Sequence, residues 1–348
     1  QDGTQVSANV PRFEDGKFGK AVMVEEGTTN LAPQDMTASD WIKENSCTVE
    51  ATGETFKGMP VYRVMFPAGT LPRTFFEFNY SDGQYFTGSI WYRFVGGYDS
   101  GEELPTFWFR ESGFGTTYIV QAFPVTTEWS SLDRTHQFSG SGTCMFLLYR
   151  SSSNTTVDVV MEFALQQLEQ KPYATSFIDG TRAAETLTIP TEGVLNPQEG
   201  TVECRVYIDP TGRHSADTDF SFLLMTRVGG PWANRISVRK LDYSTQWDAI
   251  FGDTSGNYTT LSFGQITERG WYRFALTWKA TRAAIFLNGV LKAETSTPNL
   301  PSVFDATLSV GTFRPYGTQS YELNSLIDDL RISNIARSDA EIAEAYAS

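Results

Sequence analysis

Cysteine is scarce in this chain, because three cysteines in 348 residues cannot form a disulfide framework. Cys204 stands in phase with Val202 and Val206 in a strand-like run, which predicts a thiol in the core. Cys47 and Cys144 could form one disulfide, but two buried thiols are the expectation we favour. The low cysteine content leaves the compartment open, since it fits a cytosolic protein, a virion or a bacterial surface protein.

Basic charge and long apolar runs are also lacking. Lys and Arg number 27 against 41 Asp and Glu, a net charge of −14, which argues against nucleic acid and an anionic membrane surface as partners. We interpret this charge mainly as a source of solubility. No apolar run approaches the length of a membrane span, no signal peptide is evident, and the first residue is Gln rather than Met. We therefore expect a processed piece of a larger protein.

Catalytic constellations are missing as well. His136 and His214 have no partner at metal-ligand spacing and are expected to be exposed. No Gly-x-Ser-x-Gly elbow and no phosphate-binding glycine loop appears. A jelly-roll glucanase would carry carboxylates at alternate positions of one strand, and the nearest match is Asp158 with Glu162. We expect a non-catalytic protein, with a glycoside hydrolase or polysaccharide lyase as the alternative.

Aromatic residues, by contrast, reach 14%, while charged residues make up only 20%. Long helices usually carry more Lys, Glu and Ala, so this composition favours an all-β chain. A length of 348 residues predicts two domains.

Short strand signals separated by Gly, Pro, Ser and Asp clusters follow one another along the chain, as in a β-sandwich. In the first half they predict strands at residues 62–66, 73–80, 90–95, 106–110, 116–123, 144–149 and 156–167. In the last quarter, residues 271–278 alternate in polarity, and residues 284–290 enter the Asn288-Gly289 turn, a strong hairpin signal. Ser338, with Glu341 three residues on, forms a capping box that predicts a helix at residues 338–346.

The runs 271–278, 284–290 and 326–333, in this order and spacing, resemble the laminin-G-like branch of the concanavalin A-like lectin/glucanase family. The resemblance covers about residues 186–348 and implies a β-sandwich that more often binds glycans than transforms them. It also implies one structural Ca²⁺ where the first and last strands meet, because Asp329 (or Asp328) matches the acidic position of the last strand. The alternative is an Asp pair hydrogen-bonded to backbone at a strand end.

The first half resembles another kind of module at its two ends. The opening residues 25–31 and the closing residues 164–178 are similar to those of carbohydrate-binding-type modules in bacteriophage structural proteins, which a laminin-G-like domain commonly follows. Here Ala164 and Leu165 stand at the positions that would hold calcium, a departure from the family pattern. The two resemblances imply an all-β fold of two jelly-roll-like β-sandwich domains in tandem, with a short C-terminal helix. The expected boundaries are an N-terminal segment 1–24, a carbohydrate-binding-module-like domain 25–180 and a laminin-G-like domain 181–348.

Strand alternation sorts the first domain into apolar core faces and opposite faces that carry tryptophan beside polar side chains. This mixture is typical of sugar sites, since sugar rings have apolar CH faces and polar rims. The predicted platform, on one face of the first sandwich, consists of Glu77, Asn79, Trp91, Arg93, Trp108, Arg110 and Gln121. The alternatives are that Trp91 and Trp108 cover the sheet beneath loops, or that the register is off by one residue.

In the second domain, Trp232 and Trp247 lie in apparent loops and are further ligand candidates, with positions as lids over the core as the alternative. Outward-facing arginines on three strands, among them Arg205, Arg239 and Arg273, could form a basic face for an acidic sugar. Salt bridging to nearby Asp and Glu is the interpretation we favour.

The sequence thus predicts non-catalytic binding of a polysaccharide or cell-surface glycan by tandem modules, whose weak single sites gain from avidity. The expected setting is a phage tail or fibre or a bacterial surface protein, located on the virion or the extracellular cell surface. The alternatives are a structural assembly module of a virion, with virion or surface-protein partners, and a polysaccharide-cleaving enzyme. Nucleic acid and membrane insertion are not expected.

Overall fold

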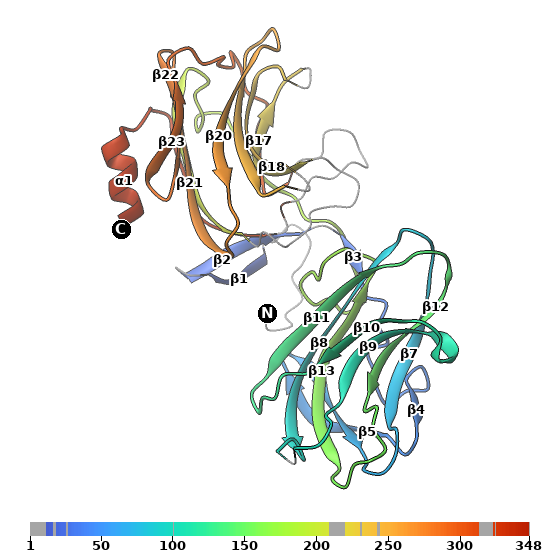
Figure 1. Ribbon diagram of the computed structural model, residues 1–348. Coiled ribbons are helices and arrows are strands. Elements are labelled where there is room, and N and C mark those ends of the chain that lie inside the picture. Colours follow the sequence, from blue (N-terminus) through green and yellow to red (C-terminus); the bar gives the residue numbers. More distant parts are fainter. Residues whose placement is uncertain are drawn as a thin grey trace. The chain divides into compact units, whose positions relative to one another are not determined.

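The computed structural model describes residues 12–16, 19–25, 27–99, 101–208, 220–229, 232–241, 244–312, 323 and 325–347. These residues form antiparallel sheets and one short C-terminal α-helix (Figure 1), so the all-β fold class is confirmed. Among them, unit 1 runs from Thr28 to Arg182, and unit 2 comprises the residues before Thr28 together with those from Ala183 on. No helix in the described ranges is long and apolar enough to cross a membrane.

Unit 1 is a sandwich of two five-stranded antiparallel sheets. Sheet I has the order β10-β9-β12-β7-β4 and consists of β4 (Ile42–Glu44), β7 (Arg73–Tyr80), β9 (Thr106–Glu111), β10 (Thr117–Ala122) and β12 (Gly142–Tyr149). Sheet II has the order β11-β8-β13-β6-β5 and consists of β5 (Thr48–Phe56), β6 (Met59–Phe66), β8 (Tyr85–Gly96), β11 (Ser130–Gln137) and β13 (Val159–Glu169). The short strands β3 (Thr28–Thr29) and β14 (Thr181–Arg182) pair at its ends, and a 3₁₀ turn, η1 (Ser112–Phe114), follows β9.

Alternation along each strand builds the core of unit 1. Phe76 and Phe146 of sheet I and Tyr92 and Phe94 of sheet II belong to one buried cluster between the sheets. Their sequence neighbours point outward, because successive strand side chains lie on opposite faces. All seven strands predicted in the first half are present, whereas β5 and β11, the two edge strands of sheet II, were not predicted.

Unit 2 is a second sandwich. Sheet III has the order β1-β2-β25-β16-β21-β22-β23 and consists of β1 (Arg12–Gly16), β2 (Gly19–Val24), β16 (Glu199–Ile208), β21 (Gly270–Lys279), β22 (Arg282–Leu287), β23 (Val290–Thr295) and β25 (Ser325–Ser333). Sheet IV has the order β15-β24-β17-β18-β19-β20 and consists of β15 (Leu187–Pro190), β17 (Phe220–Arg227), β18 (Arg235–Leu241), β19 (Gln246–Gly252), β20 (Tyr258–Gln265) and β24 (Thr307–Val310). One apolar cluster, which includes Val206, Phe251 and Phe274, fills the space between them.

Strand β2 shows that residues near the N-terminus belong to unit 2. It pairs with β25 through Val22 opposite Ile327, and Ala21 and Val24 are buried. Within the expected N-terminal segment 1–24, β1 and β2 therefore contribute to sheet III, and the described chain passes from unit 2 into unit 1 and back.

Helix α1 (Asp339–Ala347) follows the predicted capping box. Ser338 N and Oγ donate to Glu341 Oε2 at 2.7 and 2.6 Å. The helix covers the outer face of sheet III, where Ile342 packs against Ala275 and Phe286 (Figure 1). The Asn288-Gly289 turn joins β22 to β23 with positive φ at both residues, as predicted.

All three cysteines are free and buried, which confirms the expectation of unpaired thiols.

Candidate functional site

The predicted platform residues lie on the outer faces of two different sheets. Trp91 and Arg93 belong to β8 of sheet II, whereas the others lie on β7, β9 and β10 of sheet I. The two sheets share one core, so their outer faces point away from each other (Figure 1). The expectation of a single platform is wrong, because alternation assigns a residue to a face of its own strand but not the strand to a sheet.

On sheet I, Trp108 covers apolar side chains. It packs on the cluster of Phe75, Met145, Leu147 and Tyr149, and its ring meets that of Tyr149 edge-on at 5.3 Å. Its indole Nε1 donates to Thr106 Oγ1. The alternative interpretation, a tryptophan that covers the sheet, therefore holds for Trp108.

The polar residues predicted around Trp108 are occupied by contacts within the protein. Arg110 Nη2 donates to Phe114 O at 2.9 Å, and its guanidinium lies 4.7 Å from the Phe114 ring. Glu77 accepts a hydrogen bond from Ser112 in η1, and Asn79 accepts one from Thr143. Gln121 Oε1 accepts from Arg134 Nε at 2.9 Å. These contacts fold η1 over sheet I and engage the polar side chains predicted to bind a sugar.

The outer face of sheet II carries an aromatic cluster that we call the shelf: Phe56, Lys57, Trp91, Arg93 and Trp129. Phe56 stacks on Trp129 at 4.3 Å and 16°, and its ring lies 5.2 Å from that of Trp91. Lys57 Nζ lies 3.9 Å above the Trp91 ring, and the Arg93 guanidinium lies 4.9 Å from the Trp129 ring. All five side chains are partly exposed, and the aromatic rings pack on buried residues that include Val61 and Ala164.

A tight hairpin positions two of these side chains. Phe56 pairs with Met59, and the two residues between them, Lys57 and Gly58, have φ values of 50° and 80°. Positive φ at both central residues defines a type I′ turn, which suits the twist of a two-residue hairpin. The hairpin thereby fixes Phe56 and Lys57 against Trp91.

Ion pairs border the shelf. Glu162 of β13 is 1% exposed and accepts from Arg63 Nη2 and Arg93 Nε, both at 2.7 Å. Burial by itself raises the pKa of Glu162, but the hydrogen bonds and charges of the two arginines outweigh it and hold that pKa below its usual value. Glu54, 63% exposed, lies 3.3 Å from Arg93. The cluster thus combines aromatic rings with two charged groups that reach solvent, since the Arg93 and Glu54 side chains are 30% and 63% exposed.

The carboxylates considered for catalysis do not form a pair. Glu162 is held by arginines, whereas Asp158 lies before β13 and accepts from Ala68 N at 2.7 Å. His136, expected to be exposed, is half-buried against Tyr118 and Phe138, and burial lowers its pKa. His214 lies outside the described residues.

The two candidate tryptophans of unit 2 differ. Trp247 is 1% exposed and packs in the core, 5.0 Å from Phe274, so its expected role in ligand binding is wrong. The polar residues before it suggested a loop, but it belongs to β19. Trp232 is partly exposed and stacks at 4.8 Å on Tyr258, whose side chain is 51% exposed.

Contacts of its own main chain and of Asn234 position the segment that carries Trp232. Asn234 Oδ1 accepts from Ser302 N at 3.0 Å and from Thr254 Oγ1 at 3.2 Å. Gly252 faces the turn so closely that an added Cβ would lie 1.9 Å from the Trp232 carbonyl oxygen. The pair of Trp232 and Tyr258 forms a partly exposed aromatic surface.

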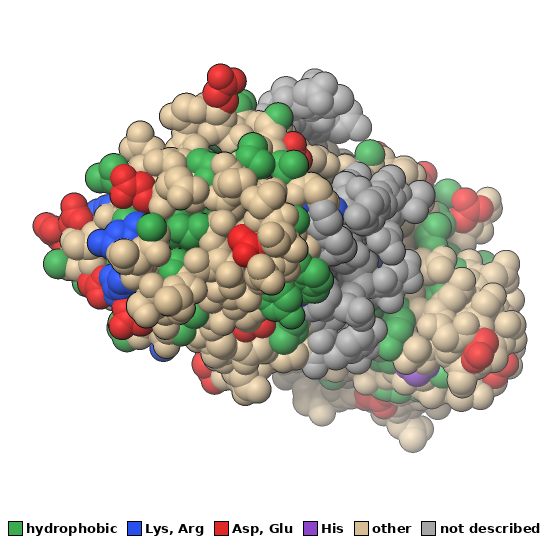
Figure 2. Space-filling view, turned by 90° about the horizontal axis from the view of Figure 1, so that it is seen from above, with side chains coloured by type: hydrophobic (Ala, Val, Ile, Leu, Met, Phe, Trp, Pro, Cys, Tyr) green, Lys and Arg blue, Asp and Glu red, His purple; other side chains and the backbone are tan. Residues whose placement is uncertain are grey.

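The outward arginines of unit 2 are largely buried or paired. Arg273 is 2% exposed and donates to Glu203 at 2.7 Å, and Arg239 is 9% exposed. At the end of the unit that carries α1, basic and acidic side chains intermix on the surface (Figure 2), where Arg282 pairs with Glu294 and Asp339 at 2.6 Å. The salt-bridge interpretation is confirmed for Arg273.

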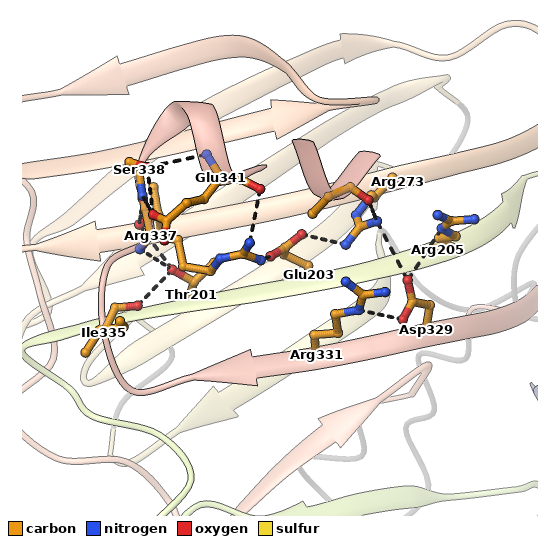
Figure 3. Close-up of polar contacts among 12 residues, drawn as sticks. Thr201, Glu203, Arg205, Arg273, Asp329, Arg331, Ile335, Arg337, Ser338 and Glu341 are labelled. Atoms are coloured by element: carbon orange, nitrogen blue, oxygen red, sulfur yellow. Dashed lines mark hydrogen bonds and ion pairs between the residues drawn. The ribbon is translucent and has the colours of Figure 1, made fainter. Parts of the chain in front are cut away.

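The residues at the implied calcium position do not fit a calcium ion. Arg331 Nε donates to Asp329 Oδ1 at 2.7 Å, while Arg205 Nε and Arg273 Nη1 lie 3.6 and 3.7 Å from Oδ2 (Figure 3). Ca²⁺ takes about six to eight oxygen ligands, but guanidinium groups are donors only and carry positive charge themselves. Asp328 contributes one buried oxygen without a partner. No group of three or more His, Cys, Asp or Glu side chains suited to a metal occurs in the described part of the chain.

Comparison with curated proteins finds no match. Among solved structures, the chain is similar to botulinum neurotoxin type C, whose cell entry depends on interaction with two ganglioside molecules. The identity is 10% over 50% of this chain and 41% of that chain, and the TM-score is 0.37. A Trypanosoma rangeli sialidase is 16% identical over 43% of this chain and 22% of that chain, with a TM-score of 0.34. The CBM40 of Ruminococcus gnavus IT-sialidase is 17% identical over 43% of this chain and 83% of that chain, with a TM-score of 0.34. The chain thus spans less than half the length of the first two.

A family model agrees with the resemblance found in the last quarter of the sequence. Residues 179–343 match the model described as the concanavalin A-like lectin/glucanases superfamily. This stretch contains the strands of sheets III and IV from β15 to β25, and leaves out β1 and β2. Residues 179–343 therefore carry a concanavalin A-like domain.

Proposed function

We propose that the protein is a non-catalytic glycan-binding protein and that a sugar binds at the shelf on sheet II. The observation that carries this proposal is the gathering of Phe56, Trp91 and Trp129, from three separate segments, on one outer face of unit 1. The concanavalin A-like domain, which lies in unit 2, supports glycan binding by the protein at the level of the family.

The chemistry of the shelf suits a carbohydrate. Indole and phenyl rings offer apolar surface to the CH face of a sugar ring, and the partly exposed Arg93 and Glu54 offer hydrogen bonds to its hydroxyl groups. Because Glu162 holds Arg63 and Arg93 in place, these donors are oriented before the ligand arrives. Preorganisation of this kind lowers the entropic cost of binding.

The pair of Trp232 and Tyr258 is a second candidate sugar surface, on unit 2. A site in each unit would raise the avidity for a repeating polysaccharide above the affinity of either site alone. We further propose that the protein acts on the virion, as part of a phage tail or fibre, or on the extracellular surface of a bacterium. The resemblance of residues 25–31 and 164–178 to phage modules supports that setting.

A glycan array followed by calorimetry with the best-bound oligosaccharide tests the proposal. We expect Trp129→Ala to lower the affinity by about two- to tenfold, since aromatic stacking contacts contribute about 0.5–1.5 kcal/mol. Trp108→Ala is the matched control, because Trp108 is similarly half-exposed but lies on sheet I, and it should leave the affinity unchanged. Melting temperatures check that both variants fold.

Two outcomes would contradict the proposal. An array without any bound glycan, together with self-assembly of the protein, would favour a structural module of a virion instead. New reducing ends or unsaturated products from mixed polysaccharides would show an enzyme, which the loss of activity on changing one carboxylate would then locate.

A further inference from the structure

A bulge in β25 brings the acid of the last strand to the outer face of sheet III. Glu203 of β16 lies opposite Arg331, and Arg205 lies opposite Asp328, so two residues of β25 face a single residue of β16. The bulge is accommodated at Asp329, whose φ of 49° lies in the left-handed region. It directs the Asp329 carboxylate towards Arg205 and not towards the opposite face.

Arg273 links this carboxylate to a second one. Its Nη1 lies 3.7 Å from Asp329 Oδ2, and its Nη2 donates to Glu203 Oε2 at 2.7 Å. Glu203, 1% exposed, also pairs with Arg337. Both Arg273 and Arg337 donate to main-chain carbonyls of α1 (Figure 3). The charged network therefore joins β16, β21 and β25 to the C-terminal helix.

Among the described residues, arginines surround both carboxylates of this network. Four arginines face the two carboxylates of Glu203 and Asp329, and they are Arg205, Arg273, Arg331 and Arg337. A divalent cation beside Asp329 would add charge of the same sign next to Arg205 and Arg273, which are only 8% and 2% exposed, where water screens such repulsion less than at the surface. It would also compete with guanidinium groups for the same carboxylate oxygens.

We infer that Arg205 and Arg273 occupy the place of a cation at this position, so that guanidinium–carboxylate pairs hold the concanavalin A-like domain together independently of calcium. The network does what a structural metal would do, because it joins the last strand to its neighbours through buried charge. This inference concerns stability and does not depend on the proposed glycan site.

Thermal unfolding of the full chain in EDTA and in millimolar CaCl₂ provides the first test. We expect the same melting temperature in both, and no heat on calorimetric titration with Ca²⁺. A site with a Kd about 100-fold below the added Ca²⁺ would raise the melting temperature by several degrees. Such a rise, if Asp329→Asn removes it, would overturn the inference.

The double variant Arg205→Gln/Arg273→Gln provides the second test. It leaves Glu203 and Asp329 with fewer cations, so we expect a lower melting temperature in EDTA that Ca²⁺ partly restores. Arg282→Gln is the matched control, because Arg282 pairs with two surface carboxylates outside the network, and it should not respond to Ca²⁺. A folded double variant whose melting temperature is the same in EDTA and in Ca²⁺ would count against the inference. If the double variant fails to fold, the comparison of the wild type in EDTA and in Ca²⁺ decides.

Discussion

At the scale of single residues, Lys57 is the least expected member of the shelf. Its ammonium group lies over Trp91 and covers one face of the ring that a sugar would use. Among the described residues Lys57 forms no ion pair, whereas Arg93 pairs with Glu162 and Glu54. Lys57 is therefore the group most easily displaced by a ligand.

Replacing Lys57 tests whether it competes with the sugar. We expect Lys57→Asn to tighten the binding of a neutral oligosaccharide about two- to fivefold, since an exposed cation–π contact contributes about 0.5–1 kcal/mol. Asn tolerates the positive φ of the turn, so the hairpin persists. Calorimetry measures the affinity, with Lys57→Arg as the control that keeps the cation. Weaker binding by Lys57→Asn would mean that the ammonium group contacts the sugar.

Glu162 is expected to stabilise unit 1 in a pH-dependent way. Its folded-state pKa is depressed, so its contribution is complete above the ordinary Glu value and is lost as the pH falls through the depressed value. We expect Glu162→Gln to cost about 2 kcal/mol at pH 7, because it removes charged hydrogen bonds to partly exposed arginines. Urea unfolding at pH 7 and at pH 3 measures this cost.

The matched control is Glu50→Gln, since Glu50 is 67% exposed and lies 3.5 Å from the same Arg63. It should change the stability by less than about 0.5 kcal/mol. A cost for Glu162→Gln that persists undiminished at pH 3 would show that packing and not charge accounts for it.

At the scale of elements, the structure separates what alternation can predict from what it cannot. The outward orientation of Trp91 and Trp108 could be predicted from their own strands. The apolar residues next to each of them recur at every second position and so mark the buried side. The partners of Trp91 were missed because Phe56 ends β5 and Trp129 precedes β11, the two edge strands of sheet II. Exposed edge strands carry polar residues on both sides, and so give a weak periodic signal.

Pairing between strands was the second limit. Which strands share a sheet depends on contacts between distant residues, which local periodicity does not contain, so Trp91 and Trp108 were assigned to one platform. The capping box and the Asn288-Gly289 turn were predicted correctly because both are local. Trp247 could have been recognised as a core residue, since Ala249 and Phe251 follow it at strand spacing.

The cap of α1 is a quantitative test at this scale. We expect Ser338→Ala to lower the stability by about 1 kcal/mol, because it removes the hydroxyl that caps the first turn. In a domain of this size that loss lowers the melting temperature by about 2–4 °C. Ser338→Thr, which keeps a hydroxyl, should stay close to the wild type. An unchanged melting temperature for Ser338→Ala would indicate that Arg337 and the packing of Ile342 alone hold the helix.

At the scale of the whole molecule, unit 1 is inserted into unit 2. The chain leaves unit 2 after β2 and returns to it before β15. The segment by which it leaves is hydrogen-bonded to the segment by which it returns. Glu25 N donates to Glu185 Oε2 at 2.7 Å, and Glu185 N donates to Glu25 O at 2.9 Å. The family match begins only at residue 179 and so does not include β2. The described residues of unit 2 thus come from two separate parts of the chain, one on each side of unit 1.

Truncation tests the insertion directly. A fragment of residues 183–348 lacks β2, which exposes the paired edge of β25 and the otherwise buried Ile327, and such an edge promotes aggregation. We expect this fragment to be poorly soluble or to melt well below the same fragment joined to residues 1–27 by a short Gly-Ser linker in place of unit 1. Circular dichroism melts and size-exclusion chromatography compare the two. If residues 183–348 alone melt at the temperature of the joined fragment, β2 is dispensable; otherwise the domain needs both parts of its divided sequence.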